Sequence, residues 1–468
     1  MAEELTKLTA RQAVALLKRR EISPLELIEA SLARIATVEP LVNALPTLSA
    51  ERARKAVAAL PEMSLLAGLP IAIKDLVEVK GVRTTRGSPI FAEHVSPHSD
   101  ILVERLERNG AVVIAKSNTP EFGAGGNTFN EVFGRTLNPW NTSLTCGGSS
   151  GGAAVALATG EVWLAQGSDL GGSLRTPASF CAVAGLRPSP GRIAAGPRTD
   201  AFDTLSVEGP MARNVGDLAL MLDAMVGADP GDPLALPAPG RAFTSHVDAA
   251  KPPKRVAFTP DLGSLVVASE VRDVCARAAR RFEGLGTVVE QASPEMSDAR
   301  EIFQVLRAHK FATAHADKLA RHRDKLKPEV IWNIERGLGL GAGEIARAVL
   351  ARTALFYRVA DFFRRYELLL CPAAPVPPFP VEERYVAEVE GHKYETYIDW
   401  VAVTFAITLT GCPALAIPCG FSADGRPIGL QLVAPPRGEA ALLEAAKLFE
   451  DAAGLAGLLP IDPRPSPP

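Results

Sequence analysis

Short apolar runs alternate with amphipathic stretches along most of the chain, which is the pattern of an α/β protein. Apolar runs at 69–73 and 111–115 predict two buried strands. The stretch 100–109 between them predicts a helix that Ser99 caps, with Gly110 in the left-handed position after its end. Further strands are predicted at 162–165, 255–258, 367–371, 414–421 and 428–433, the last two as a hairpin around Ala423-Asp424-Gly425.

Helix start signals are clearest near the beginning of the chain. Thr9 is followed by Gln12, and Ser23 by Glu26, so each pair matches a capping box, and Pro24 suits the first helical turn. Further helices are predicted near 270–285 and through most of 296–366, with a break at the glycine-rich 337–343. The Pro/Gly-rich stretch 229–240 is interpreted as either a linker or a surface loop.

Composition and charge narrow the class of protein. The 468 residues are 47% hydrophobic and 22% charged, which is the balance of a globular protein with a large core. The formal net charge is −3 and no dense run of Lys and Arg occurs, so a nucleic-acid partner is not expected. Because charges are scattered through residues 1–20 and no later stretch could span a bilayer, we expect neither a signal peptide nor a membrane association.

Cysteine and histidine usage argues against disulfides and metals. The six Cys residues form no CxxC pair, so neither a disulfide framework nor a thiolate zinc site is expected, and a reducing cytoplasm is the simplest location. The seven His residues form no HExxH or comparable ligand cluster. We therefore expect no metal and no cofactor.

The first candidate for chemistry is the glycine-rich segment TCGGSSGG at 145–152, which precedes the helix-like AAVALA. Backbone amides would converge at such a loop, as they do where proteins hold phosphate. A P-loop needs a Lys directly before its Ser or Thr, and none is present here. A tight turn required by packing is the competing interpretation.

The second candidate is Ser173, in the segment GSDLGGSLRTP at 167–177 that follows a predicted strand. Two glycines before a serine let consecutive N–H groups point the same way, as an oxyanion hole requires. No His occurs between His98 and His246, so a Ser-His-Asp arrangement has no local support. Lys74, at the end of its apolar run, could serve as the base if burial favours its neutral form, although a lysine at a strand end is more often solvated.

Three segments together closely resemble the amidase signature family of serine hydrolases: PIAIKD at 70–75, GGSSGG at 147–152, and 169–189. Ser149 lies 24 residues before Ser173, which is the spacing that family shows. Smaller matches occur at 209–213, 371–372, 411–414 and 425–436, and the resemblance runs from about residue 5 to about residue 455.

The resemblance implies a Ser-Ser-Lys triad. Ser173 would be the nucleophile, Ser149 the bridging serine after a cis peptide bond from Gly148, and Lys74 the base. Ser150 would adjust this network. The backbone amides that would form the oxyanion hole are those of Leu170, Gly171, Gly172 and Ser173. Asp169 and Arg175 are interpreted as an ion pair that supports the structure, and Cys146 and Cys181 as small core residues.

The resemblance also implies the fold and the place of the substrate. The fold is a single α/β/α domain over residues 1–468, with a large mixed twisted sheet covered by helices on both faces. Its motif core would lie at about 65–215, and a variable, mainly helical substrate region at about 296–400. The pocket would be built from 122–133 and 300–400, and its candidate aromatic residues are Phe129, Tyr397 and Trp400.

The function expected from the resemblance is hydrolysis of a small-molecule carboxylic amide, extending to an ester, anilide or carbamate, with release of ammonia or an amine. A homo-oligomer is compatible with it. The first alternative is the glutamine-hydrolysing subunit of a tRNA-dependent amidotransferase. In proteins of that kind, the residue ten positions before the glycine of the GxPA motif is a carboxylate that meets the amino group of glutamine, and here that position is Val401. The second alternative is a non-enzymatic binding protein, in which Ser173 would be dispensable.

Overall fold

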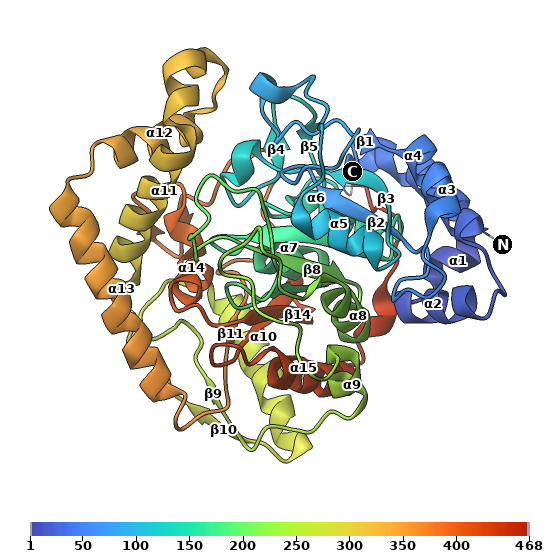
Figure 1. Cartoon of the computed structure of the whole chain (residues 1–468). Coiled ribbons are helices and arrows are strands. Elements are labelled where there is room, and N and C mark those ends of the chain that lie inside the picture. Colours follow the sequence, from blue (N-terminus) through green and yellow to red (C-terminus); the bar gives the residue numbers. More distant parts are fainter. Residues whose placement is uncertain (1, 466–468) are drawn as a thin grey trace.

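The computed structural model describes residues 2–465 and is built around one large sheet (Figure 1). Within these residues the sheet has 11 strands in the order β1-β3-β2-β6-β8-β7-β14-β15-β11-β9-β10. The strands are β1 (Thr47–Leu48), β2 (Pro70–Lys74), β3 (Val112–Ser117), β6 (Leu164–Asp169), β7 (Ala184–Arg187), β8 (Val207–Ala212), β9 (Arg255–Phe258), β10 (Val288–Gln291), β11 (Leu368–Pro372), β14 (Ala414–Phe421) and β15 (Pro427–Val433). Two small hairpins lie apart, β4 (Phe129–Asn130) with β5 (Gly134–Arg135), and β12 (Glu388–Val389) with β13 (His392–Lys393).

The sheet is mixed. Parallel pairing joins β2 to β3 and β6 on one side, and β9 to β10 and β11 on the other. The strands between these groups, β8, β7, β14 and β15, pair antiparallel with their neighbours. The predicted hairpin of β14 and β15 is confirmed. β2 and β6 are direct neighbours, so the end of the strand that carries Lys74 lies beside the strand that leads to the Ser173 loop.

Both faces of the sheet are covered. Alternate side chains of a strand point to opposite faces, and Ile71 and Ile73 of β2 join one core cluster while Ala72 joins another. The first cluster packs against α2, α5, α8 and α15, and the second against α3, α4, α6 and α7. The predicted α/β class, with a large mixed sheet between helices, is confirmed.

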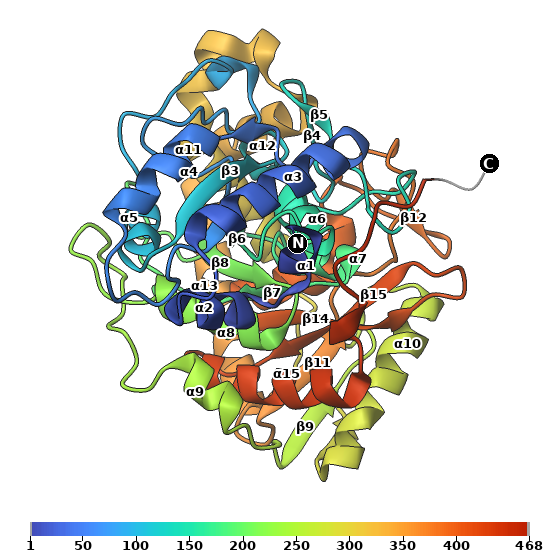
Figure 2. The same ribbon diagram turned by 90° about the vertical axis from the view of Figure 1, so that its right-hand side faces the viewer.

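The helices include those predicted at the beginning of the chain, at 100–109, near 270–285 and through most of 296–366, together with others that were not predicted. They are α1 (Ala2–Lys7), α2 (Ala10–Lys18), α3 (Pro24–Val42), α4 (Ala50–Ala56), α5 (Ile101–Arg108), α6 (Gly151–Ala158), α7 (Arg175–Cys181), α8 (Val215–Met225), α9 (Phe243–Asp248), α10 (Ser269–Ala279), α11 (Ala299–His322), α12 (Pro328–Leu338), α13 (Ala342–Phe362), α14 (Ala402–Leu409) and α15 (Glu439–Ala453). Figures 1 and 2 place α11–α13 on the opposite side of the molecule from α1–α4. Within residues 2–465, no helix combines the length and apolar character needed to cross a membrane.

Of the N-terminal helix caps predicted from the sequence, those of α2 and α3 are observed and that of α5 is not. Both predicted capping boxes form, at Thr9 and at Ser23. The predicted cap of α5 was wrong, because Asp100 rather than Ser99 accepts the N–H of Leu102. Ser99 instead accepts the N–H of Lys80 from the preceding loop. The stretch 229–240 is a loop whose Leu236 N–H donates to the carbonyl of Gly191, so it packs on the body of the protein rather than linking two parts.

Candidate active site

Lys74 is the last residue of β2, and its side chain is completely buried. The strand holds it there, because its backbone N–H donates to the side-chain oxygen of Gln166 on β6 at 2.9 Å. Its Nζ atom donates to the hydroxyl oxygens of Ser149, Ser150 and Ser168 at 2.7, 2.9 and 3.1 Å. The three nearest partners of this buried amine are therefore all uncharged hydroxyl groups.

Burial lowers the pKa of Lys74 from its ordinary value to about 7. The cause is desolvation, which penalises the charged ammonium. The carboxylates of Glu208 and Asp169 act in the opposite direction but are outweighed. At neutral pH a large fraction of Lys74 is consequently a neutral amine with a free electron pair, which is the state that a general base requires.

The glycine loop before α6 presents Ser149 and Ser150 to this amine. The peptide bond from Gly148 to Ser149 is cis, as the resemblance implied. Thr128 Oγ1 donates to the carbonyl of Gly147 at 2.8 Å and so ties the loop to a neighbouring segment. The Ser150 N–H donates to the carbonyl of Ser173 at 3.1 Å, which connects the two serine-containing loops directly.

Ser173 lies in the turn between β6 and α7, and Asp169 at the end of β6 organises that turn. One carboxylate oxygen of Asp169 accepts the N–H of Gly172 and the other accepts the N–H of Leu174, both at 3.0 Å. The same carboxylate pairs with Arg175 at 2.8 Å and with Arg187 at 3.4 Å, and all three side chains are fully buried. The predicted ion pair of Asp169 and Arg175 is confirmed, with Arg187 as a third member.

Burial alone would raise the pKa of Asp169, but the guanidinium groups of Arg175 and Arg187 outweigh it and hold this pKa well below its ordinary value. Asp169 therefore stays ionised at all pH values of interest. A fixed negative charge in this position keeps both N–H groups of the turn oriented inward.

One of the four backbone amides expected to form the oxyanion hole already has an acceptor within the protein. The N–H of Gly172 is already donated to Asp169, so the structure does not leave it free for an oxyanion. Among the described residues, the N–H groups of Leu170, Gly171 and Ser173 have no acceptor. Thr404 Oγ1 donates to the carbonyl of Gly171 at 2.6 Å and fixes the turn from the side of α14. Gly172 has φ +123°, and a Cβ there would meet Thr404 Oγ1 at 2.3 Å, so only glycine fits.

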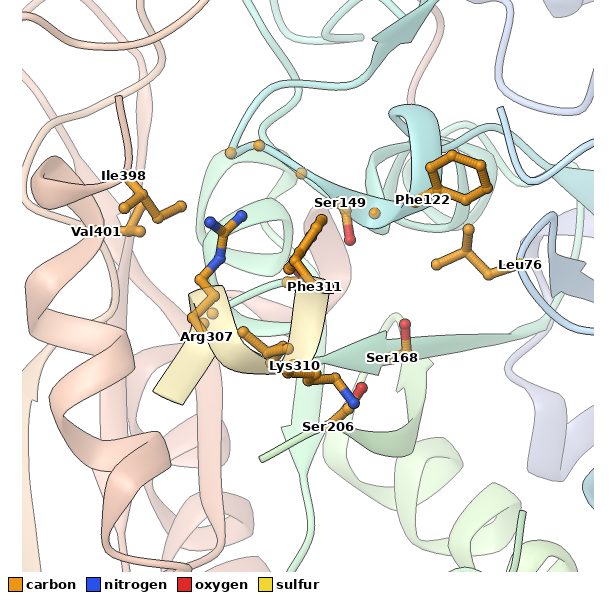
Figure 3. A pocket seen from close by; sticks show the side chains of 18 of the residues that line it. Leu76, Phe122, Ser149, Ser168, Ser206, Arg307, Lys310, Phe311, Ile398 and Val401 are labelled. Atoms are coloured by element: carbon orange, nitrogen blue, oxygen red, sulfur yellow. The ribbon is translucent and has the colours of Figure 1, made fainter. Parts of the chain in front are cut away.

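A pocket opens above the two serine-containing loops (Figure 3). Ser149 and Ser173 line it together with Ser168, while Lys74 lies behind them. The remaining polar lining comes from Thr176 and Ser206 and from side chains of α11. Its apolar lining consists of Leu76, Phe122, Leu170, Phe303, Phe311, Ala314, Ile398 and Val401, with glycines of the 123–126 loop.

Helix α11 forms one wall of the pocket. Its lining residues are spaced three or four apart, as expected for one face of a helix: Phe303, Arg307, Lys310, Phe311, Ala314 and His315. Phe303 stacks on Phe405 of α14 with ring centroids 4.2 Å apart, so the wall is anchored to the element that also supports the Ser173 turn.

Three predicted pocket residues lie elsewhere. Phe129 lines a separate surface groove, where Lys327 and Arg384 lie over its ring. Tyr397 is buried behind Arg307 and accepts a hydrogen bond from it at 2.6 Å. Trp400 is buried against Phe379 and beneath Gly126. An aromatic residue in a substrate-binding region can belong to the hydrophobic core or line the pocket, and the sequence alone does not distinguish these two positions.

Other site residues carried no signal that the sequence analysis used. Ser168 provides the third hydroxyl partner of Lys74 from within β6, where the sequence predicted a glycine turn. Thr404 and Arg307 come from helices more than one hundred residues away from Ser173 in the chain. Within residues 2–465, no group of three or more His, Cys, Asp and Glu side chains could hold a metal ion.

Comparison with known proteins assigns this arrangement to a family. The family model described as Amidase matches residues 26–443. The chain belongs to the amidase signature family. An acylamidase of Rhodococcus erythropolis is 34% identical over 459 residues, which cover 95% of each chain. The structure of a bacterial aryl acylamidase superimposes with a TM-score of 0.91 at 27% identity and covers 96% of this chain and 97% of that one.

Another relative has a different role. A glutamyl-tRNA(Gln) amidotransferase subunit of Prochlorococcus marinus is 34% identical over 475 residues, covering 94% of this chain and 96% of that one. Identity alone therefore does not separate a simple amidase signature hydrolase from an amidotransferase subunit. The protein is an amidase.

Proposed function

We propose that this amidase signature enzyme hydrolyses small-molecule carboxylic amides through an acyl-enzyme on Ser173. The observation that carries this proposal is the buried amine of Lys74, 2.7 Å from Ser149 Oγ, beneath a pocket that Ser149 and Ser173 both line. Ser173 is assigned as the nucleophile because it lies in the glycine turn beside backbone amides that have no acceptor among the described residues, while Ser149 is engaged with the amine of Lys74.

Acylation uses Lys74 as the base and Ser149 as the relay. Neutral Lys74 accepts the proton of Ser149 while Ser149 accepts that of Ser173, and Ser173 Oγ forms a bond to the carbonyl carbon of the amide. The carbonyl π electrons move to its oxygen, which becomes an oxyanion. When the tetrahedral intermediate collapses, the C–N bond breaks and the same relay returns a proton to the departing nitrogen.

Deacylation repeats the sequence with water. Lys74, again neutral, removes a proton from water through Ser149, the hydroxide oxygen bonds to the acyl carbon, and Ser173 leaves with the returned proton. Ser150 and Ser168 supply the remaining partners of Nζ and so hold its electron pair toward Ser149. Both serines act as positioning residues.

The oxyanion would be stabilised by the N–H groups of Leu170, Gly171 and Ser173. These amides are fixed before the reaction by Asp169 and Thr404, so no reorganisation is needed as charge develops. The Gly172 N–H contributes indirectly, because its bond to Asp169 sets the curvature of the turn.

The amidotransferase role is the second candidate, since subunits of that kind are as similar in sequence as the acylamidase. The pocket favours the simple hydrolase. Val401, the position where the resemblance would place the carboxylate of an amidotransferase subunit, lines the pocket with an apolar side chain, and the described lining contains no Asp or Glu. The ammonium group of glutamine would find no carboxylate among the residues that line this pocket.

The test is turnover of a panel of amides, anilides, esters and carbamates by the purified enzyme and by Ser173→Ala. Amide hydrolysis that falls by about three orders of magnitude or more in Ser173→Ala is the expected result, because removal of a nucleophile leaves only binding and oxyanion stabilisation. Ser264→Ala, which removes an exposed hydroxyl outside the pocket lining, is the control and should retain activity. Unchanged turnover in Ser173→Ala would contradict the proposal and favour a binding protein.

A further inference from the structure

The charged residues on the pocket wall are all basic. Arg307 and Lys310 lie one helical turn apart on the face of α11 that lines the pocket, and no Asp or Glu belongs to the described lining. His315 adds no charge, because burial lowers its pKa to about 3 and leaves it neutral at physiological pH. The charged residues of this lining thus come from α11, which carries both Arg307 and Lys310 (Figure 3).

Lys310 is neutralised within the protein and Arg307 is not. Lys310 Nζ forms an ion pair with the carboxylate of Asp203, which accounts for its charge. The guanidinium of Arg307 donates to the side-chain oxygen of Asn333 and to the hydroxyl of Tyr397, both uncharged. In the part of the chain that the structure describes, no carboxylate pairs with it.

The lack of a counter-charge is unusual because Arg307 is buried. The residue is only 3% exposed, and its guanidinium lies 4.6 Å from the ring centroid of Phe311 and 5.4 Å from that of Tyr397. A guanidinium keeps its proton in proteins and carries five N–H donors, of which two are used here. Buried charges are normally paired, since an uncompensated one is costly. The guanidinium of Arg307 therefore lacks a counter-charge until an anion enters the pocket.

We propose that Arg307 binds a carboxylate of the substrate, so that the preferred substrates are amides that also carry an acid group. This inference rests on the proposed amide hydrolysis and specifies its substrate class. Phe303, Phe311 and Val401 are apolar residues of the same pocket lining, and Phe311 lies directly beside the guanidinium, so water would be excluded from the ion pair of Arg307 with a carboxylate, which strengthens a charge-assisted contact. Asn333 and Tyr397 act as positioning residues, because they hold the guanidinium plane from behind.

The proposed carboxylate site also predicts a substrate preference that distinguishes this enzyme from a glutaminase. Glutaramic acid has the side-chain amide and the carboxylate of glutamine but lacks its ammonium group. With Arg307 present and Val401 apolar, the pocket complements the first two groups and not the third. Glutaramic acid should therefore be hydrolysed better than glutamine.

The experiment compares matched substrates in wild type, Arg307→Gln and Arg307→Lys. One arm pairs monoamides of short straight-chain dicarboxylic acids with the plain alkanamides of the same length, and a second arm pairs N-acyl amino acids with N-acyl alkylamines. The arms show whether the acid lies on the acyl or the amine side. A third measurement is calorimetric binding of glutarate, which needs no turnover.

The expected result is a kcat/KM for the acid that exceeds its neutral partner by roughly tenfold to a hundredfold in one arm, as for a charge-assisted hydrogen bond. Arg307→Gln should abolish that ratio and glutarate binding, with a far larger fall in kcat/KM for the acid than for its neutral partner, and Arg307→Lys should keep part of the ratio. Arg321→Gln, which removes an exposed charge from the far end of the same helix, should change nothing.

A wild-type enzyme that prefers the neutral partners in both arms would overturn the inference. So would an Arg307→Gln variant that loses both substrates equally, because that pattern shows a structural role. Failure of the proposed function is distinguishable, since the enzyme would then cleave no amide in either arm. In that case glutarate bound by wild type but not by Arg307→Gln would still support the carboxylate site, and equal binding would reject it.

Discussion

Lys74 illustrates how one residue acquires its chemistry from its surroundings. In the sequence it is an ordinary lysine after an apolar run, and the absence of a nearby His together with the family resemblance suggested it as a base. The structure supplies the physical reason, since complete burial among hydroxyl groups lowers its pKa to about 7. The burial depends on β2 and β6 pairing, which local sequence does not reveal.

This pKa leads to a pH prediction. The base form of Lys74 is the neutral amine, so kcat/KM should rise with pH through about 7 and level off above it. Lys74→Arg keeps the charge but cannot lose its proton, and it should retain less than about a tenth of wild-type acylation at any pH. Lys80→Arg, at an exposed position nearby, serves as the control and should behave as wild type. Substantial activity in a folded Lys74→Arg would mean that another group is the base.

Val401 leads to a prediction about specificity. Glutamine should be a poor substrate, because its ammonium forfeits a charge-assisted hydrogen bond worth about 1.5–3 kcal/mol. Val401→Asp should raise kcat/KM for glutamine relative to a neutral amide, roughly tenfold or more. The measurement is ammonia release from both substrates by both proteins. Glutaminase activity of the wild type above every neutral amide tested would reverse the ranking in favour of the amidotransferase role.

Among the elements, β6 and the turn that follows it were only partly predictable. The sequence predicted a strand at 162–165 and a glycine turn from 167, whereas β6 runs from Leu164 to Asp169. The glycine Gly167 stays in the strand because it pairs with Gly209 of β8, and that pairing partner lies outside any local window. The turn residues that surround Ser173 were predictable because their glycines and the Asp-Arg pair are close in sequence.

Asp169 leads to a prediction about stability. Asp169→Asn would leave Arg175 and Arg187 buried without a counter-charge, so the free energy of unfolding should fall by about 3–5 kcal/mol. The control is Asp317→Asn, whose partners Lys318 and Arg321 pair with it at an exposed site, and it should cost less than about 1 kcal/mol. Chemical denaturation measures both.

The pH dependence of that difference follows from the lowered pKa of Asp169. The stabilisation is present above the unfolded carboxyl pKa of about 3.9 and is lost as the pH falls toward the folded value. The difference in the free energy of unfolding between wild type and Asp169→Asn should therefore become smaller below about pH 4. An equal loss for Asp169→Asn and Asp317→Asn at neutral pH would contradict the role given to the buried pairs.

The outer helices show what the sequence could not provide. Their existence and the break near 337–343 were predicted from amphipathic spacing, and α11, α12 and α13 confirm them. The side chains that α11 places in the pocket were not predicted, because the contact with the Ser173 turn depends on the tertiary packing of Phe303 against Phe405. The catalytic candidates were found from motif spacing, and the specificity residues were not.

For the whole molecule we propose one folding domain over residues 1–468. One sheet extends through the described residues, and a single core cluster joins α2 near the beginning of the chain to α15 near its end. Calorimetric unfolding should show one transition, and limited proteolysis under native conditions should release no stable fragment. Two separate transitions, or a stable half of the chain, would contradict this proposal.

The central claim is that Ser173 forms the covalent bond to the substrate. A fluorophosphonate tests it directly, because Ser173 Oγ would form a bond to phosphorus as fluoride leaves and the adduct would not turn over. Mass spectrometry should find one adduct on the wild-type protein, located by peptide mapping on the segment that contains Ser173, and none on Ser173→Ala. Labelling of another serine, or the same adduct on Ser173→Ala, would contradict the claim.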